Sequence, residues 1–95
     1  MQARVVTAPF QPGKIDEGAR EFRDTVVPRA KEYPGFKGAL MLTDPSTGKT
    51  LAITLWETEA EMKATETGFQ QSVSRVAQAL AGPPTQESYE VSVQV

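Results

Sequence analysis

The spacing of hydrophobic residues changes several times along the chain, and each change marks a predicted element. Alternating or β-branched stretches are typical of strands, whereas apolar residues three and four apart are typical of helices. The predicted strands are 3–8, 36–43, 49–56 and 89–95, and the predicted helical regions are 15–33 and 58–80. This β-α-β-β-α-β order predicts an α+β fold of ferredoxin-like type, a single domain over 1–95 with a four-stranded antiparallel sheet.

Proline, glycine and capping residues predict where these elements bend or end. Pro28 removes a hydrogen-bond donor inside the first helical region, so we expect a kink or a looser last turn there. The segment 44–48, Asp-Pro-Ser-Thr-Gly, is typical of a tight turn and predicts an antiparallel hairpin between the strands on either side. Capping boxes that begin at Thr58 and Thr67 predict two consecutive helices with a break near Gly68.

The two faces of the predicted middle strands differ in character, because residues two apart in a strand share a face. One face of 49–56 carries only Leu51, Ile53 and Leu55, and we expect the two helices to cover this aliphatic face. The opposite face combines small, hydroxyl-bearing and large apolar side chains: Ala39, Met41, Ala52, Thr54 and Trp56.

A mixed face that leaves methionine and tryptophan in water is unusual for a monomer. We therefore expect a homodimer that packs sheet against sheet, with Ala39, Met41, Ala52 and Thr54 in the dimer interface. The alternative is a solvated face that tolerates a few apolar groups.

Composition excludes several classes of chemistry. The chain has no cysteine and no histidine, so it has no disulfide framework, no thiolate nucleophile and none of the commonest ligands of transition metals. With 10 Lys and Arg against 12 Asp and Glu, a net charge of −2 argues against binding to nucleic acid. No apolar run has the length of a signal peptide or of a membrane span, so a cytoplasmic protein without membrane contact is expected.

Three blocks in the middle of the chain have the order and spacing of a known family. They are Val26-Val27-Pro28, then Tyr33-Pro34-Gly35-Phe36-Lys37-Gly38, then Leu51-Ala52-Ile53-Thr54-Leu55-Trp56-Glu57-Thr58. Together they resemble the antibiotic biosynthesis monooxygenase-like domains of the dimeric α+β barrel superfamily. The resemblance implies that two ferredoxin-like subunits join their sheets into a barrel.

The resemblance also implies two candidate chemistries, which are cofactor-free oxygenation of phenolic or anthrone-type compounds and oxidative breakdown of haem. Haem-degrading members use an Asn near the first strand, a Trp in the second helical region and a His after it. The matching Trp and His positions here, counted without gaps from Trp56, are Thr65 and Arg75, and the chain contains no asparagine. Haem breakdown is therefore not expected, and neither a cofactor nor a metal site is predicted.

Cofactor-free oxygenation requires that the protein desolvate its substrate and stabilise the substrate anion. The candidate substrate-binding residues offer aromatic walls, hydroxyls or charge: Trp56, Arg75, Phe69, Tyr33 and Tyr89, with Arg4 as a further donor. Trp56 could equally serve as a packing or interface anchor, and Arg75 could equally be solvated. No single residue is marked as catalytic.

These observations predict a monooxygenase-like protein that binds, or oxidises without a cofactor, a small phenolic or anthrone-type aromatic compound. The alternative is a non-catalytic dimeric module that binds a small molecule or assists another protein. The absence of histidine, asparagine and cysteine favours that alternative.

Overall fold

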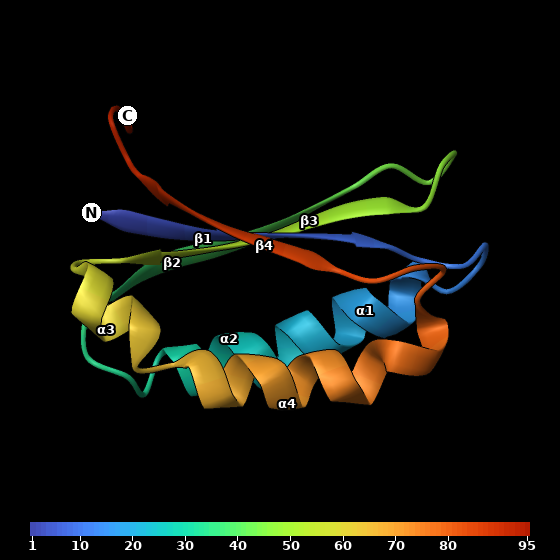
Figure 1. Ribbon diagram of the computed structural model, residues 1–95, viewed down its shortest axis with the longest axis horizontal. Coiled ribbons are helices and arrows are strands. Elements are labelled where there is room, and N and C mark those ends of the chain that lie inside the picture. The colour runs from blue at the N-terminus through green and yellow to red at the C-terminus, as the bar shows by residue number, and fades with distance from the viewer.

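A computed structural model describes residues 1–95, and it has the predicted ferredoxin-like arrangement. Four antiparallel strands form one sheet in the order β2-β3-β1-β4. They are β1 (Gln2–Pro9), β2 (Phe36–Thr43), β3 (Lys49–Trp56) and β4 (Thr85–Glu90). Every helix lies on the same side of this sheet, so the other side is open (Figure 1).

Two helical segments form one layer over the sheet, one segment after β1 and one after β3 (Figure 1). The helices are α1 (Ile15–Glu21), α2 (Val27–Ala30), α3 (Glu59–Lys63) and α4 (Glu66–Val76). A π-helical turn over Phe22–Val26 joins α1 to α2. Pro28 explains the π-helical turn, because a proline nitrogen cannot donate to the carbonyl one turn earlier. The irregularity predicted at Pro28 is therefore present, but it lies in the turn before the proline.

The predicted helix starts after β3 are partly right. Thr58 caps α3, since its Oγ1 accepts a hydrogen bond of 3.1 Å from the Glu61 nitrogen, as the first capping box predicts. The second box is wrong, because α4 already begins at Glu66 and Gly68 lies inside it. The break between the two helices falls at 64–65, about one turn earlier than predicted.

The last strand is also displaced from its prediction. Its sheet pairing ends at Glu90, which lies opposite Gln2, and 91–95 follow without strand structure. Strict alternation predicted 89–95 because it measures side-chain pattern alone. A strand also needs a neighbour, and β1 begins at Gln2, so the chain beyond Val91 has no strand residue beside it.

The assignment of the two sheet faces is wrong, and the faces are exchanged. Met41, Ala52, Thr54 and Trp56 lie on the helix side, and Ala39 joins them because it pairs with Thr54 in the register. These residues therefore cannot form an interface on the open side of the sheet.

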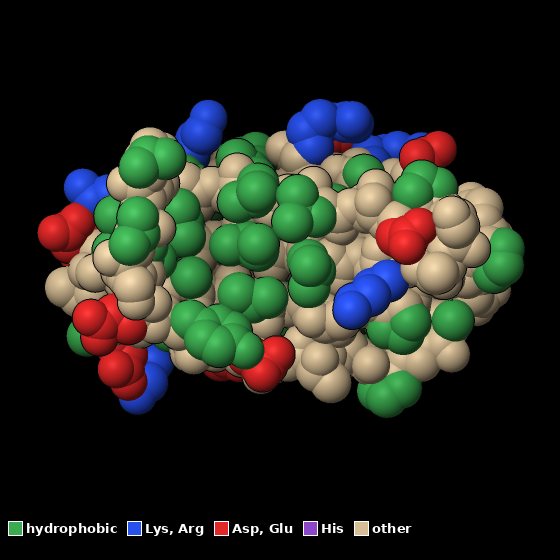
Figure 2. Space-filling view, turned by 90° about the horizontal axis from the view of Figure 1, so that it is seen from above, with side chains coloured by type: hydrophobic (Ala, Val, Ile, Leu, Met, Phe, Trp, Pro, Cys, Tyr) green, Lys and Arg blue, Asp and Glu red, His purple; other side chains and the backbone are tan.

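The open face carries the aliphatic residues that were expected beneath the helices. Leu51, Ile53 and Leu55 pair with Leu42, Leu40 and Gly38 of β2 and share their face. Leu40 and Leu42 remain 43% and 46% exposed. Figure 2 looks onto this side and shows apolar side chains gathered at its centre. The more hydrophobic face of the sheet is not the covered one here, because side chains do not fill all of the space between the helices and the sheet.

The packed core of the chain is correspondingly small. Only 14 of the 95 residues are buried, and the one hydrophobic cluster among them consists of Ala30, Trp56 and Met62, with Phe36 packed against it. This cluster lies at the end of the sheet where β3 leads into α3. The space between the remaining sheet and helices is therefore available for a cavity.

Candidate functional site

A cavity of about 130 Å³ lies between the helices and the covered face of the sheet. Its wall is mainly apolar and comes from both layers: Val6, Phe10, Phe22, Val26, Met41, Ala52, Trp56, Phe69, Val73, Val76 and Leu80. A cavity of about 150 Å³ with such a lining holds one benzene molecule. The volume and lining are therefore those of a site for a single aromatic ring.

Trp56 forms one rigid wall of this cavity. It is 1% exposed, and the rings of Tyr33 and Phe36 meet it edge to face at centroid distances of 6.5 and 5.5 Å. Its Nε1–H donates to the Thr54 hydroxyl over 2.9 Å, so this donor is already used. Trp56 can therefore contact an aromatic ligand through its ring surface but has no N–H to offer it.

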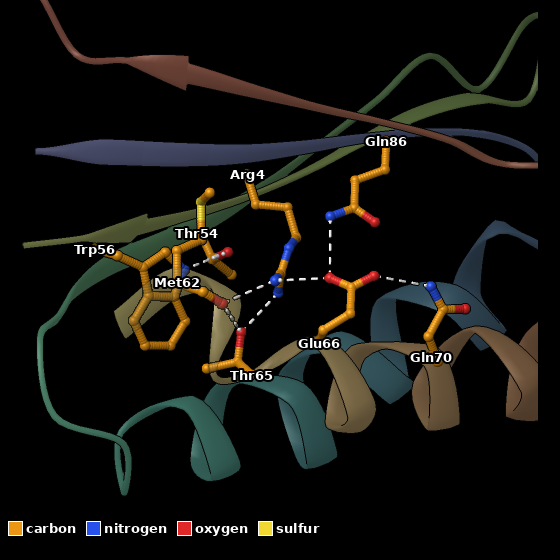
Figure 3. Close-up of polar contacts among 8 residues, drawn as sticks. All are labelled: Arg4, Thr54, Trp56, Met62, Thr65, Glu66, Gln70 and Gln86. Atoms are coloured by element: carbon orange, nitrogen blue, oxygen red, sulfur yellow. Dashed lines mark hydrogen bonds and ion pairs between the residues drawn. The ribbon is translucent and has the colours of Figure 1, made fainter. Parts of the chain in front are cut away.

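Arg4 brings a positive charge into the site. Its side chain leaves β1 on the helix side and reaches the junction of α3 and α4 (Figure 3). Nη1 donates to Thr65 Oγ1 over 2.8 Å, and Nη2 donates to the Met62 carbonyl over 2.9 Å and to Glu66 Oε2 over 3.1 Å. The residue is 5% exposed, and its Nε–H is buried without a partner.

The surroundings of Arg4 balance its charge only in part. Burial lowers the pKa of Arg4, and the nearby carboxylate of Glu66 opposes that shift. Hydrogen bonding from Gln70, with smaller contributions from Gln86 and Arg4, holds the pKa of Glu66 below its ordinary range despite some desolvation. The ring of Phe69 lies 5.1 Å from the guanidinium carbon and adds a cation–π contact. The guanidinium is thus ionised, buried and fixed in position.

Hydroxyl groups provide the other polar features of the cavity. Thr54 and Thr65 are buried lining residues whose oxygens already take part in hydrogen bonds to Trp56 and Arg4. Ser72 of α4 is buried and lines the cavity. Ser72 therefore adds a second polar group that a ligand can use.

The mouth of the cavity lies between α2 and α4. A shallower depression beside it shares Arg29, Tyr33 and Gly68 with the cavity wall. Arg29 Nη1 donates to Gln71 Oε1 over 3.2 Å and bridges the two helices at this point. Because these side chains are exposed, they can move aside without disturbing the sheet.

Glu21 is the only carboxylate in the cavity wall, and it does not act as a free base. Its Oε2 lies 3.1 Å from Arg75 Nη1 in an ion pair. No cluster of three or more acidic residues in the chain is arranged to hold a metal ion. The arrangement can therefore desolvate a ring and donate hydrogen bonds to it, but it offers no unpaired carboxylate to remove a proton.

The five predicted substrate-binding residues do not converge on one place. Trp56, Phe69 and Tyr33 line the cavity. Arg75 lies outside it, with an exposed side chain directed to Glu21. Tyr89 is 49% exposed and pairs with Ala3, which places it on the open face, with β1 between it and Leu55. The cavity therefore brings together only three of the five candidates, Trp56, Phe69 and Tyr33.

Ser72 and the full role of Arg4 were missed in the sequence, although a signal for each exists. Ser72 lies three residues after Phe69 and four before Val76, so helical spacing places it on the apolar face of α4. Arg4 shares its strand face with Val6, which lines the same cavity. A charged residue on a covered face indicates either a buried ion pair or a binding group, and the ion pair with Glu66 is present here.

Several solved structures with the same fold are named antibiotic biosynthesis monooxygenases. A candidate antibiotic biosynthesis monooxygenase from Nitrosomonas europaea superposes with a TM-score of 0.80 at 19% identity, over 98% of this chain and 100% of that chain. A monooxygenase from the gene ActVA-Orf6 of Streptomyces coelicolor, in complex with nanaomycin D, gives 0.77 at 19%, over 99% and 89%. This chain has the fold of antibiotic biosynthesis monooxygenase domains, as the sequence resemblance predicts.

Sequence comparison is less informative. No family model matches the chain. Two uncharacterised proteins of Mycobacterium tuberculosis, Rv2558 and Rv2557, are each 31% identical to it over 96% and 95% of its length. The chain spans only 39% and 40% of the length of these relatives. No helix of the structure has the length and apolar character needed to cross a membrane.

Proposed function

We propose that this protein binds a small phenolic aromatic compound in the cavity and oxidises it with molecular oxygen without a cofactor. The observation that carries the proposal is an apolar, aromatic-walled cavity that contains one buried guanidinium, that of Arg4. Such a site removes water from a ring and favours negative charge that develops on the ring oxygen. The monooxygenase name of the Streptomyces coelicolor neighbour supports the type of reaction.

In this reaction the substrate itself supplies the electrons. A phenol with a hydrogen opposite its hydroxyl reacts with O₂ to give a quinone and one water molecule: the ring C–H and the phenolic O–H are broken, and one oxygen atom becomes the new C=O group. The CH₂ group of an anthrone gives a C=O group and one water molecule in the same way, so atoms and electrons balance without an added reductant. The protein contributes by holding the ring against Trp56 and Phe69 and by stabilising the anion that reacts with O₂.

The size of the cavity limits which aromatic compounds fit. At about 130 Å³ it accepts one ring, as in a simple phenol or hydroquinone. Compounds of the anthrone type have three fused rings and need side chains at the mouth, Arg29 and Tyr33, to swing outward. We therefore expect monocyclic substrates to bind first and larger ones to require this movement.

Oxygen uptake with a panel of hydroquinones and anthrones tests the proposal. We expect uptake above background with the wild type and at least a tenfold loss with Ala52→Leu, which extends a side chain into the cavity. Ala60→Leu is the matched control, because it makes the same exchange at an exposed position of α3 outside the cavity and should leave the rate unchanged. Uptake that is absent across the panel, or equal in all three proteins, contradicts the proposed oxidation.

The open face of the sheet supports a homodimer as the working form. Its aliphatic residues are exposed or only partly buried in the single chain: Leu40 and Leu42 are exposed, and Leu51, Ile53 and Leu55 are partly buried. A second copy packed sheet against sheet would remove this surface from water and compensate for the small core. Light scattering at micromolar concentration tests this; a single 10.3 kDa species would contradict it.

The second candidate function is a module that binds the aromatic compound but does not oxidise it. The pairing of Glu21 with Arg75 favours this function, because no unpaired carboxylate faces the cavity to act as a base. Saturable binding without oxygen uptake across the panel would select the binding module over the enzyme.

A further inference from the structure

We propose that the Nε–H of Arg4 recognises the oxygen atom of the aromatic ligand, and that the site selects rings with a neutral oxygen acceptor over carboxylates. Suitable ligands are phenols and aromatic ketones or quinones. This inference rests on the proposed binding of an aromatic compound in the cavity. It adds which protein atom contacts the ligand oxygen and which charge the ligand carries.

The pattern of used and unused donors on Arg4 is the first argument. Nη1 and Nη2 are occupied by Thr65, the Met62 carbonyl and Glu66, whereas Nε has no partner and is buried. A buried donor without a partner costs about 1–3 kcal/mol and is rare in native structures. Arg4 belongs to the cavity wall, so an oxygen-bearing ligand there can supply the missing acceptor.

The fixed position of Arg4 is the second argument. The side chain starts from a central strand of the sheet, its three hydrogen bonds tie it to the junction of α3 and α4, and Phe69 covers its face (Figure 3). A donor that is held before the ligand arrives loses little conformational freedom on binding. The Nε–H therefore suits a recognition role better than a mobile surface arginine does.

Charge is the third argument, and it sets the ligand class. The Glu66 carboxylate lies 3.1 Å from Nη2 and already offsets part of the positive charge. The cavity wall holds only one other cation, Arg29 at the mouth, which is bonded to Gln71. A carboxylate ligand would thus enter an apolar space without an unpaired cation, which is costly. A neutral oxygen needs only the one hydrogen bond that Nε offers.

The test compares three probes on the wild-type protein: phenol, toluene and benzoate. Phenol and toluene have the same shape and size and differ in one oxygen atom. Trp56 fluorescence reports whether a probe occupies the cavity, and the NMR signal of the Arg4 Nε–H reports hydrogen bonding. That signal should be resolved because the other arginines are exposed and exchange faster with water: Arg20, Arg23, Arg29 and Arg75.

We expect phenol and toluene both to change Trp56 fluorescence in a saturable way, and only phenol to shift the Arg4 Nε–H signal downfield. Benzoate should bind at least tenfold more weakly than phenol. If phenol changes Trp56 but moves the Nε–H signal no more than toluene does, or if benzoate binds as well as phenol, the inference is overturned and the proposed function stands. If no probe changes Trp56, both are overturned.

A variant provides an independent measurement. Arg4→Met keeps an unbranched side chain that reaches to the position of Nε and removes every donor, and circular dichroism shows whether it folds. In the folded variant the ratio of phenol affinity to toluene affinity should fall about fivefold to tenfold, the value of one hydrogen bond. An unchanged ratio overturns the inference. If the variant does not fold, the wild-type NMR comparison decides.

Discussion

The two faces of the sheet present different surfaces to different neighbours. The face beneath the helices carries Ala52, Thr54 and Trp56 and encloses a cavity, whereas the opposite face carries Leu51, Ile53 and Leu55 and has no cover within the chain. The helices therefore lie over the less aliphatic side. This difference indicates that the covered face is built to leave space, and that the open face holds the apolar surface that a second copy would bury.

The packing of the helices agrees with this division. Helices that pack on a filled core contribute many buried aliphatic residues, yet α4 buries a serine, Ser72, and borders the cavity with Phe69 and Val73. The single chain thus buries little apolar surface in its own interior. Its stability as a single chain should be modest, and the open face should add to it upon association.

The largest expected effect comes from a charge on the open face. Ile53→Asp should dissociate the proposed dimer at micromolar concentration, because burying a carboxylate in an apolar interface costs several kcal/mol per ion. Light scattering measures the result. Ala60→Asp is the matched control, since Ala60 is exposed in the first turn of α3, where a carboxylate is tolerated. Equal masses for both variants would show that the open face is not the interface.

Filling the cavity beneath the helices should stabilise the protein, whereas a charge on the open face should weaken its association. Ala52→Leu adds three carbon atoms to a site with unoccupied volume, so it should raise the free energy of unfolding by about 1–2 kcal/mol. The same change should reduce binding of phenol at least tenfold. Urea unfolding and Trp56 fluorescence measure the two effects. A variant that is destabilised and still binds phenol would contradict this prediction. It would mean that there is no free space above Ala52 and that phenol binds elsewhere.

Thr54 tests the polar support of the covered face. Thr54→Val should lower the free energy of unfolding by about 1–3 kcal/mol, because the buried Trp56 Nε1–H loses its acceptor. Thr50→Val is the control: Thr50 makes only a 3.4 Å bond to the Gly48 carbonyl, which also accepts from the Phe10 nitrogen. Thermal or urea unfolding should therefore separate the two variants, and equal losses would contradict the assigned role of Thr54.

The smallest expected effect is a pH dependence at Glu66. Its pKa is lowered in the folded state, chiefly by hydrogen bonding from Gln70, so it binds fewer protons when folded than when unfolded. Its contribution is present above its ordinary pKa of 4.5 and is lost as the pH falls through the lower folded value. The wild type should therefore lose stability below that pH more steeply than Glu66→Gln. Parallel melting curves for both proteins would contradict this role.

Sequence pattern predicts the fold well because its signals are local. The hairpin of 36–43 and 49–56, the first helix start and the Thr58 cap all follow from neighbouring residues, and the structure has them. The register of β4 could not be predicted, because it depends on where β1 begins. The side of the sheet that the helices cover could not be predicted either, since both faces are apolar enough to be buried.

The candidate site was predictable only in its aromatic part. Trp56, Phe69 and Tyr33 are found in the cavity wall because large side chains near the helices have few other places to lie. The partners of Arg4 are 58 to 62 residues away in sequence, so no local spacing could reveal them. Arg75 lies one residue before Val76, a cavity residue, but the helical turn directs it outward to Glu21.

The most direct test of the division between the two faces is a crystal structure of the protein grown with phenol. We predict one phenol ring between sheet and helices against Trp56, with its oxygen within hydrogen-bond distance of Arg4 Nε, and a second chain on the open face. Phenol found only on the aliphatic face, with side chains filling the space above Ala52, would contradict the account.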